Sequence, residues 1–123
     1  MFPVHRNETG MFQELAHVSN MAFGQLSVLG VNPGCTRGGH YHIRKQEWFC
    51  AVSGTGILKI MDLETREEKI FSLDGFKERQ FFLVNPNEVH WVINTDPYTD
   101  LEVLIIISEE YDKRNADTFK FEE

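Results

Sequence analysis

The sequence has 123 residues, 41% of them hydrophobic and 25% charged, which is typical of one globular domain and excludes a largely disordered chain. Its formal net charge of −7 argues against nucleic-acid and membrane partners, because both attract a positive surface. The two cysteines lack the spacing of a disulfide scaffold or zinc finger, and neither a signal peptide nor a bilayer-spanning apolar run is visible, so we expect a cytoplasmic protein with a single domain at 1–123.

Turn-forming residues recur along the chain and separate short apolar stretches. The turn signals lie at 7–10, 32–34, 53–56, 74–75, 85–87 and 94–97. Turns at such short and fairly even intervals are typical of an antiparallel β-sandwich or barrel. The sequence therefore predicts an all-β fold.

We expect strands at 11–18, 25–31, 57–62 and 101–107. The last of these is nearly all apolar and rich in β-branched residues, which indicates burial on both faces. The charged segment at 64–69 is expected to be a hairpin tip, and only 108–115 shows weak helical periodicity. Closing the sheet would remove the exposed edges that so many strands create.

Between residues 34 and 54 the sequence combines glycines with His40, His42 and Glu47. Residues two apart on a strand point to the same face, so the two histidines project together. The chain can turn at 43–46, which lets Glu47 return to that face from the next strand. Two imidazoles and a carboxylate suit zinc, manganese, iron or nickel. His90, which follows the turn at 85–87, offers a fourth ligand.

This arrangement resembles the two motifs of the cupin superfamily. The first motif is matched at every position, by Gly34, His40, His42, Glu47 and Gly54. In the second motif His90 and Asn94 fit, while Asn85 and Asn87 stand where the family has proline and glycine. After glycine, asparagine is the residue that best tolerates a left-handed backbone, so we expect the turn to persist. The resemblance implies a cupin double-stranded β-helix, or jelly-roll barrel, with a metal held by His40, His42, Glu47 and His90.

Within the superfamily, the segment TRGGHYHIRKQEWFCAVSGTG at 36–56 most resembles the C-terminal cupin domain of bifunctional capsular-polysaccharide UDP-sugar reductase/epimerases. The segments at 7–12 and 116–119 resemble the beginning and the end of that domain. The nucleotide-sugar 3,4-ketoisomerases are more distant relatives that often lack the glutamate and the metal, so Glu47 favours the metal-binding branch. The sequence contains no GxGxxG loop for a dinucleotide, and we expect proton transfer without hydride transfer.

The resemblance implies a nucleotide-linked 4-keto sugar as substrate, with C3 epimerisation or ketone isomerisation through an enolate, in surface-polysaccharide biosynthesis. A divalent metal, with zinc first and nickel, manganese or iron as alternatives, would polarise the ketone or have a structural role. If the metal is absent, His42 or His90 is the candidate base, because imidazole titrates near neutral pH. Arg37, Arg44 and Lys45 are the candidate ligands of the diphosphate.

Other interpretations of the chain stay open. It could be a sugar-binding or sensing cupin without catalysis, or another metal cupin such as a small dioxygenase or a sugar-phosphate isomerase. Tyr41 should face away from the histidines, Trp91 should serve packing, and Cys50 should be buried. Small cupins usually dimerise through N-terminal strands, so 1–4 and 11–18 are the expected contacts of a homodimer.

Overall fold

The structure is a computed structural model that describes the backbone of residues 1–123 and every side chain except that of Asn20. Its regular elements are β1 (Val4–Asn7), β2 (Gly10–Gln13), the 3-10 helix η1 (Val18–Asn20), β3 (Gln25–Val31), β4 (Thr36–Tyr41), β5 (Glu47–Ser53), β6 (Thr55–Asp62), β7 (Glu68–Asp74), β8 (Phe82–Val84), β9 (Glu88–Asn94), β10 (Leu101–Ile107), the 3-10 helix η2 (Lys113–Asn115) and β11 (Phe119–Lys120). The predicted all-β class is confirmed.

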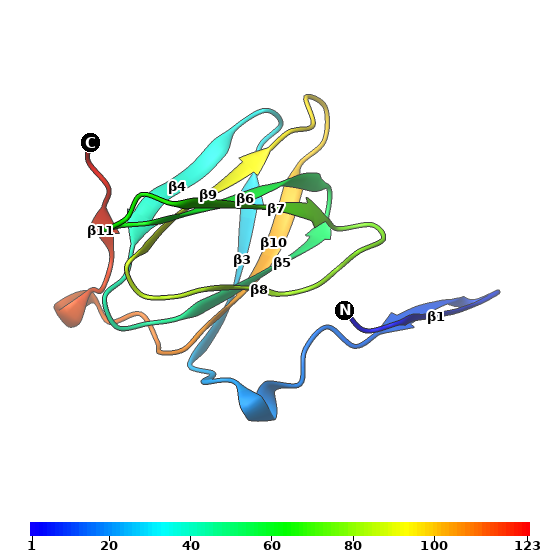
Figure 1. The fold of residues 1–123 in the computed structure, drawn as a ribbon. Helices are drawn as coiled ribbons and strands as arrows, with labels where there is room; N and C mark the ends of the chain where they lie inside the picture. Colours follow the sequence, from blue (N-terminus) through cyan, green and yellow to red (C-terminus); the bar gives the residue numbers. More distant parts are fainter.

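Two antiparallel sheets face each other and enclose the core (Figure 1). One has the strand order β3-β10-β5-β8 and the other the order β11-β4-β9-β6-β7. Their inner faces contribute the buried apolar side chains, among them Phe49, Leu58, Leu73, Val92 and Val103. Along β3 and β6, more buried side chains alternate with less buried ones, whereas β5 and β10 each contain three consecutive buried residues.

The strands predicted at 25–31, 57–62 and 101–107 are confirmed. The strands at 25–31 and 101–107 have the predicted bounds, and the strand predicted at 57–62 begins two residues earlier, at Thr55. Glu102 is the exposed exception on the otherwise largely buried β10. The charged segment at 64–69 forms the turn from β6 into β7, which begins at Glu68.

The strand predicted at 11–18 is wrong beyond Gln13. Its partner is β1, in which Val4 pairs with Gln13, so no β1 residue remains to pair with the following segment. A strand needs such a partner for its backbone groups, and the chain instead leaves regular structure until η1. The weak helical signal at 108–115 likewise yields only the short η2.

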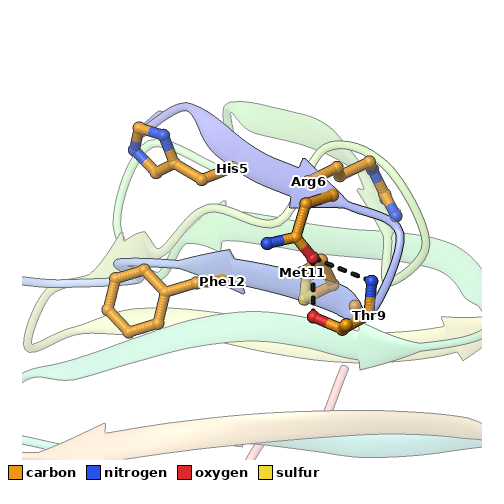
Figure 2. Close-up of a pocket in the computed structure, with 7 residues that line it drawn as sticks. His5, Arg6, Thr9, Met11 and Phe12 are labelled. Carbon is orange, nitrogen blue, oxygen red and sulfur yellow. Dashed lines mark hydrogen bonds between the residues drawn. The ribbon is translucent and has the colours of Figure 1, made fainter.

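The β1–β2 hairpin is a separate two-stranded sheet that projects away from the barrel (Figure 1). Its side chains are mostly exposed, including Met11 and Phe12. A hollow of about 350 Å³ lies on this hairpin, with His5, Arg6 and Phe12 around it (Figure 2). The hollow is remote in sequence from the predicted ligands.

Candidate metal centre

The predicted ligands come from three strands of the barrel. His40 lies near the end of β4, His42 directly follows that strand, and Glu47 begins β5. His90 lies on β9, and the register places it directly opposite His40. The turn at 43–46 therefore returns the chain as the sequence predicts, and cross-strand pairing supplies the last histidine.

The side chains converge on one point. The three histidines each offer a nitrogen within 4.8 Å of the others, and the ring centroids of His40 and His90 are 4.8 Å apart. Glu47 Oε1 lies 2.5 Å from His42 Nε2 and 3.3 Å from His90 Nε2. Ligands of one cation crowd together in this way, and the arrangement fits a small divalent ion held by nitrogen and oxygen.

Three of these ligand atoms have no hydrogen-bond partner. His42 Nε2, His90 Nε2 and Glu47 Oε1 are buried, and although they lie close together none is aligned for hydrogen bonding. An unsatisfied buried polar atom costs about 1–3 kcal/mol, and such atoms call for a missing partner. A cation between them would satisfy all three lone pairs at once. The residues present therefore fit a divalent metal.

The other ring nitrogens determine which atoms are free to bind. His42 Nδ1 lies 2.5 Å from the carbonyl oxygen of Asp117, and His90 Nδ1 lies 3.1 Å from that of Glu88. A carbonyl only accepts hydrogen bonds, so each Nδ1 carries the proton and donates it. Each Nε2 is then left to present its lone pair to the centre, as in metal-binding histidines.

The electrostatics of the cluster lower the pKa values of two of its members, Glu47 and His40. Burial by itself raises the pKa of Glu47, but the contacts with His42 and His90 outweigh it and hold the pKa well below its usual range. Burial, together with the neighbouring His90 and His42, lowers the pKa of His40 from 6.5 to about 4. At neutral pH the site thus offers a carboxylate and a neutral imidazole, the forms that bind metals.

A cavity of about 300 Å³ opens onto the cluster. It is lined by His40, Glu47 and His90, by Arg37 and Gly38, and by the apolar side chains Leu29, Phe49, Val92 and Ile105. Both sheets contribute to this lining, so the cavity lies in the lumen of the barrel. Apolar walls with a few convergent polar groups are typical of a small-molecule site.

Of the three predicted phosphate ligands, Arg37 lines this cavity. Arg44 instead forms an exposed ion pair with Glu109, at 2.8 Å, and also donates to the carbonyl of Asn115. Lys45 is buried, and its backbone N–H donates to Asp117. Neither Arg44 nor Lys45 is part of the cavity lining.

Several predictions about neighbouring residues are confirmed. Tyr41 stacks on Phe119, and Trp91 packs under Lys59. Cys50 is fully buried.

The two asparagines of the second motif have structural roles. Asn87 has a φ of +63°, so an asparagine adopts the left-handed turn where the family has glycine. Asn94 is buried and donates to the carbonyls of Val31 and Thr99, which ties the end of β9 to the end of β3 and to the loop before β10.

Asp117 is a residue of the site that the sequence did not single out. This buried carboxylate accepts hydrogen bonds from the backbone of 43–45, although it lies more than seventy residues away in the sequence. Its only sequence signal was its place in the segment at 116–119, which resembles the family's ending.

The fold and the cluster together define a cupin-type jelly-roll barrel. Residues 5–119 match the family described as the polysaccharide biosynthesis C-terminal domain, and the chain belongs to that family. The described residues include no helix that is long and apolar enough to cross a membrane.

Similar proteins share this barrel as part of longer chains. The UDP-2-acetamido-2,6-beta-L-arabino-hexul-4-ose reductase of Pseudomonas aeruginosa is 31% identical over 117 residues, which are 95% of this chain and 30% of the relative. The capsular polysaccharide assembling protein CapF of Staphylococcus aureus matches with a TM-score of 0.76 and 25% identity, over 100% of this chain and 35% of CapF. The chain thus spans about a third of either protein.

A third likeness concerns the fold alone. The dTDP-6-deoxy-D-glucose-3,5-epimerase RmlC of Legionella pneumophila, solved in complex with dTDP-4-keto-L-rhamnose, matches with a TM-score of 0.80 at 15% identity. The match covers 98% of this chain and 69% of RmlC.

Proposed function

We propose that the protein is a metal-dependent cupin that epimerises or isomerises a nucleotide-linked 4-keto sugar in surface-polysaccharide biosynthesis. The observation that carries the proposal is the group of three unpartnered ligand atoms, two of which belong to Glu47 and His90 in the lining of a cavity that Arg37 also lines. The names of the relatives support the substrate class, because one acts on a UDP-linked hexulose and another was solved with a dTDP-linked keto sugar.

Each side chain has a role that follows from its place. His40, His42, Glu47 and His90 would hold the ion, zinc first with nickel, manganese or iron as alternatives, and a bound ion supplies Lewis-acid polarisation of a ketone oxygen. The apolar walls exclude water from the reacting carbons. Arg37 is the cavity's guanidinium and would take the diphosphate in a bidentate contact.

His42 and His90 can each have one of two roles, metal ligand or general base, and the same ring nitrogen, Nε2, would serve in either. Each has one ring nitrogen committed to a backbone carbonyl, so its Nε2 either binds the ion or accepts a substrate proton. With the ion bound, both rings are ligands. Without it, either Nε2 could remove the proton next to the ketone; the C–H electron pair would then form the C=C bond of the enolate as the C=O π pair moves onto oxygen.

The first test is metal content, measured by elemental analysis on protein purified without a metal-affinity step. We expect close to one ion per chain in the wild type and a loss of most of it in Glu47→Gln. Glu102→Gln is a matched control, because this glutamate is exposed on the same sheet. Wild-type protein free of metal would refute the metal-dependent mechanism and favour a metal-free isomerase with His42 or His90 as base.

The second test is proton exchange. A UDP-linked 4-keto sugar incubated with the protein in deuterium oxide should incorporate deuterium next to the ketone, and the product should be detected by NMR. Binding of the sugar without incorporation would instead support a sensing cupin.

We also propose that the protein is a homodimer, with a second copy of this chain covering the outer face of the β3 sheet. On β3, Leu26 and Val28 are 55% and 67% exposed, and one edge of this strand is unpaired within the described chain. The projecting hairpin also exposes Phe12, and an isolated two-stranded hairpin is at best marginally stable. Exchanging hairpins between two copies would cover both surfaces at once.

The dimer is tested by light scattering coupled to size exclusion. Val28→Asp should shift the wild-type dimer toward monomer. Ile70→Asp is the control, because Ile70 is 62% exposed on β7 of the other sheet. A monomeric wild type at micromolar concentration would refute the dimer.

A further inference from the structure

The buried carboxylate of Asp117, which is not a predicted metal ligand, holds the turn between the predicted ligands His42 and Glu47. Asp117 is 2% exposed and lies between η2 and β11. Its side chain accepts hydrogen bonds from the backbone N–H groups of Ile43 at 2.8 Å, Arg44 at 2.8 Å and Lys45 at 3.0 Å. Three consecutive donors on one carboxylate define the course of the turn.

This turn connects two ligands of the proposed metal centre. His42 precedes it and Glu47 follows it, so its course determines how far apart their side chains start. Without the Asp117 side chain, the N–H groups of Ile43, Arg44 and Lys45 would lose their partner, and that of Lys45 is buried. The turn would then have to rearrange or admit water.

Asp117 also contacts the ring of His42 directly. Its backbone carbonyl accepts the proton of His42 Nδ1, while the N–H of Asn87 donates to the His42 carbonyl at 2.7 Å. The ring and the backbone of this ligand are thus held from two sides. For His90 the corresponding carbonyl belongs to Glu88, two residues away on the same strand. His42 therefore depends on a remote segment for its orientation, whereas the orientation of His90 is local.

Further contacts keep the remote segment in place. Arg44 bonds Glu109 and the carbonyl of Asn115 on the N-terminal side of Asp117. On the other side, Phe119 pairs with Tyr41 and the rings stack. The C-terminal segment is thereby attached to β4 and the ligand turn at several points.

We propose that Asp117 is a positioning residue that orients His42 and fixes its proton on Nδ1, so that Nε2 is available to the ion; this inference rests on the proposed metal-dependent function. The side chain sets the course of the turn and the carbonyl holds the ring. Arg44 helps to hold the same segment in place through its hydrogen bonds to Glu109 and to the carbonyl of Asn115.

The test compares Asp117→Asn with Asp112→Asn. The asparagine keeps the size of the side chain but replaces one acceptor oxygen with a donor, which cannot accept from the turn. Asp112 lies in the same segment, is exposed and caps η2, so it is the matched control. Zinc affinity, measured by competition with a chelator on metal-free protein, should fall about 10–100-fold in Asp117→Asn and stay within about twofold in Asp112→Asn. Wild-type affinity in Asp117→Asn would overturn the proposal.

A second readout does not require metal. In metal-free protein with ¹⁵N-labelled histidine, the wild type should show a slowly exchanging proton on His42 Nδ1, assigned with His42→Gln. Its exchange should be at least about tenfold faster in Asp117→Asn, because the hydrogen-bonded segment opens more often. A wild-type His42 without this proton would refute the inference even if the variant failed to fold. If the proton is present but no zinc binds, the proposed metal function fails while the positioning role stands.

Discussion

Gly38 lies on β4 opposite Trp91 of the ligand-bearing strand β9, and replacing it with alanine tests the geometry of the site. Its φ is +117°, and the register of the two strands shifts between Gly38 and His40. An added Cβ would lie 2.5 Å from the carbonyl oxygen of His90 and 3.0 Å from Cα of Trp91. Both neighbours are backbone atoms of a central strand, so neither can rotate away.

Two costs add in Gly38→Ala. Holding a residue other than glycine in this backbone region costs about 1–3 kcal/mol. Forcing an extra carbon into a packed site costs a further 1–3 kcal/mol or so. We therefore expect the free energy of unfolding to fall by about 2–6 kcal/mol. Because His90 must shift, zinc affinity should fall as well.

Urea denaturation at equilibrium measures this loss, with an unchanged slope showing that the unfolded state is the same. Gly34→Ala is the matched control, because Gly34 also has a positive φ, of +69°, but nothing lies within 4 Å of its added carbon. We expect the control to show only the backbone cost of about 1–3 kcal/mol. If Gly38→Ala loses no more stability than the control, the close approach of β4 and β9 at the ligands is wrong.

Three further predictions concern charge and reactivity. Because the pKa of His40 is lowered to about 4, the unfolded chain binds an extra proton between about pH 4 and 6.5, so the stability of the metal-free protein should decline as the pH falls through this window. In urea titrations at pH 7, 6 and 5, His40→Asn should lose less unfolding free energy on acidification than the wild type. An equal pH dependence in both proteins would contradict the lowered pKa of His40. Burial raises the pKa of Cys50 to about 11, whereas Cys35 is exposed, so a thiol reagent at pH 8 should label one cysteine in the native protein and two in denaturant. Arg37→Gln should weaken UDP binding, measured by calorimetry, about 10–100-fold, because Arg37 lines the cavity. Arg44→Gln should change UDP binding by no more than about twofold, because Arg44 pairs with Glu109 outside the cavity. Equal losses in the two variants would refute the assignment of the diphosphate to Arg37.

Local periodicity was enough to predict much of the barrel and part of the site. Partial alternation located β3, and a nearly continuous apolar, β-branched run located β10, which is buried along most of its length. The same period of two places His40 and His42 on one face of the chain. The left-handed turn at Asn87 was also foreseeable, because it depends on the backbone preference of one residue type.

The N-terminal strand shows where local pattern fails. The sequence extended it to Val18, but a strand ends where its partner ends, and β1 supplies pairing only as far as Gln13. The boundary is set by where the paired strand of the hairpin begins, at Val4, and the residue pattern of 11–18 by itself carries no record of that.

The remaining parts of the site depend on contacts that only the folded barrel creates. His90 faces His40 because of the register between β4 and β9, and register is decided by packing across sheets. Arg37 and Arg44 are both arginines beside the same motif, yet the first lines the cavity and the second is held by Glu109. Asp117 reaches the turn at 43–45 across more than seventy residues. A sequence pattern determines which face of a strand a side chain takes, and the tertiary structure decides what that face meets, because the partner comes from a distant part of the chain.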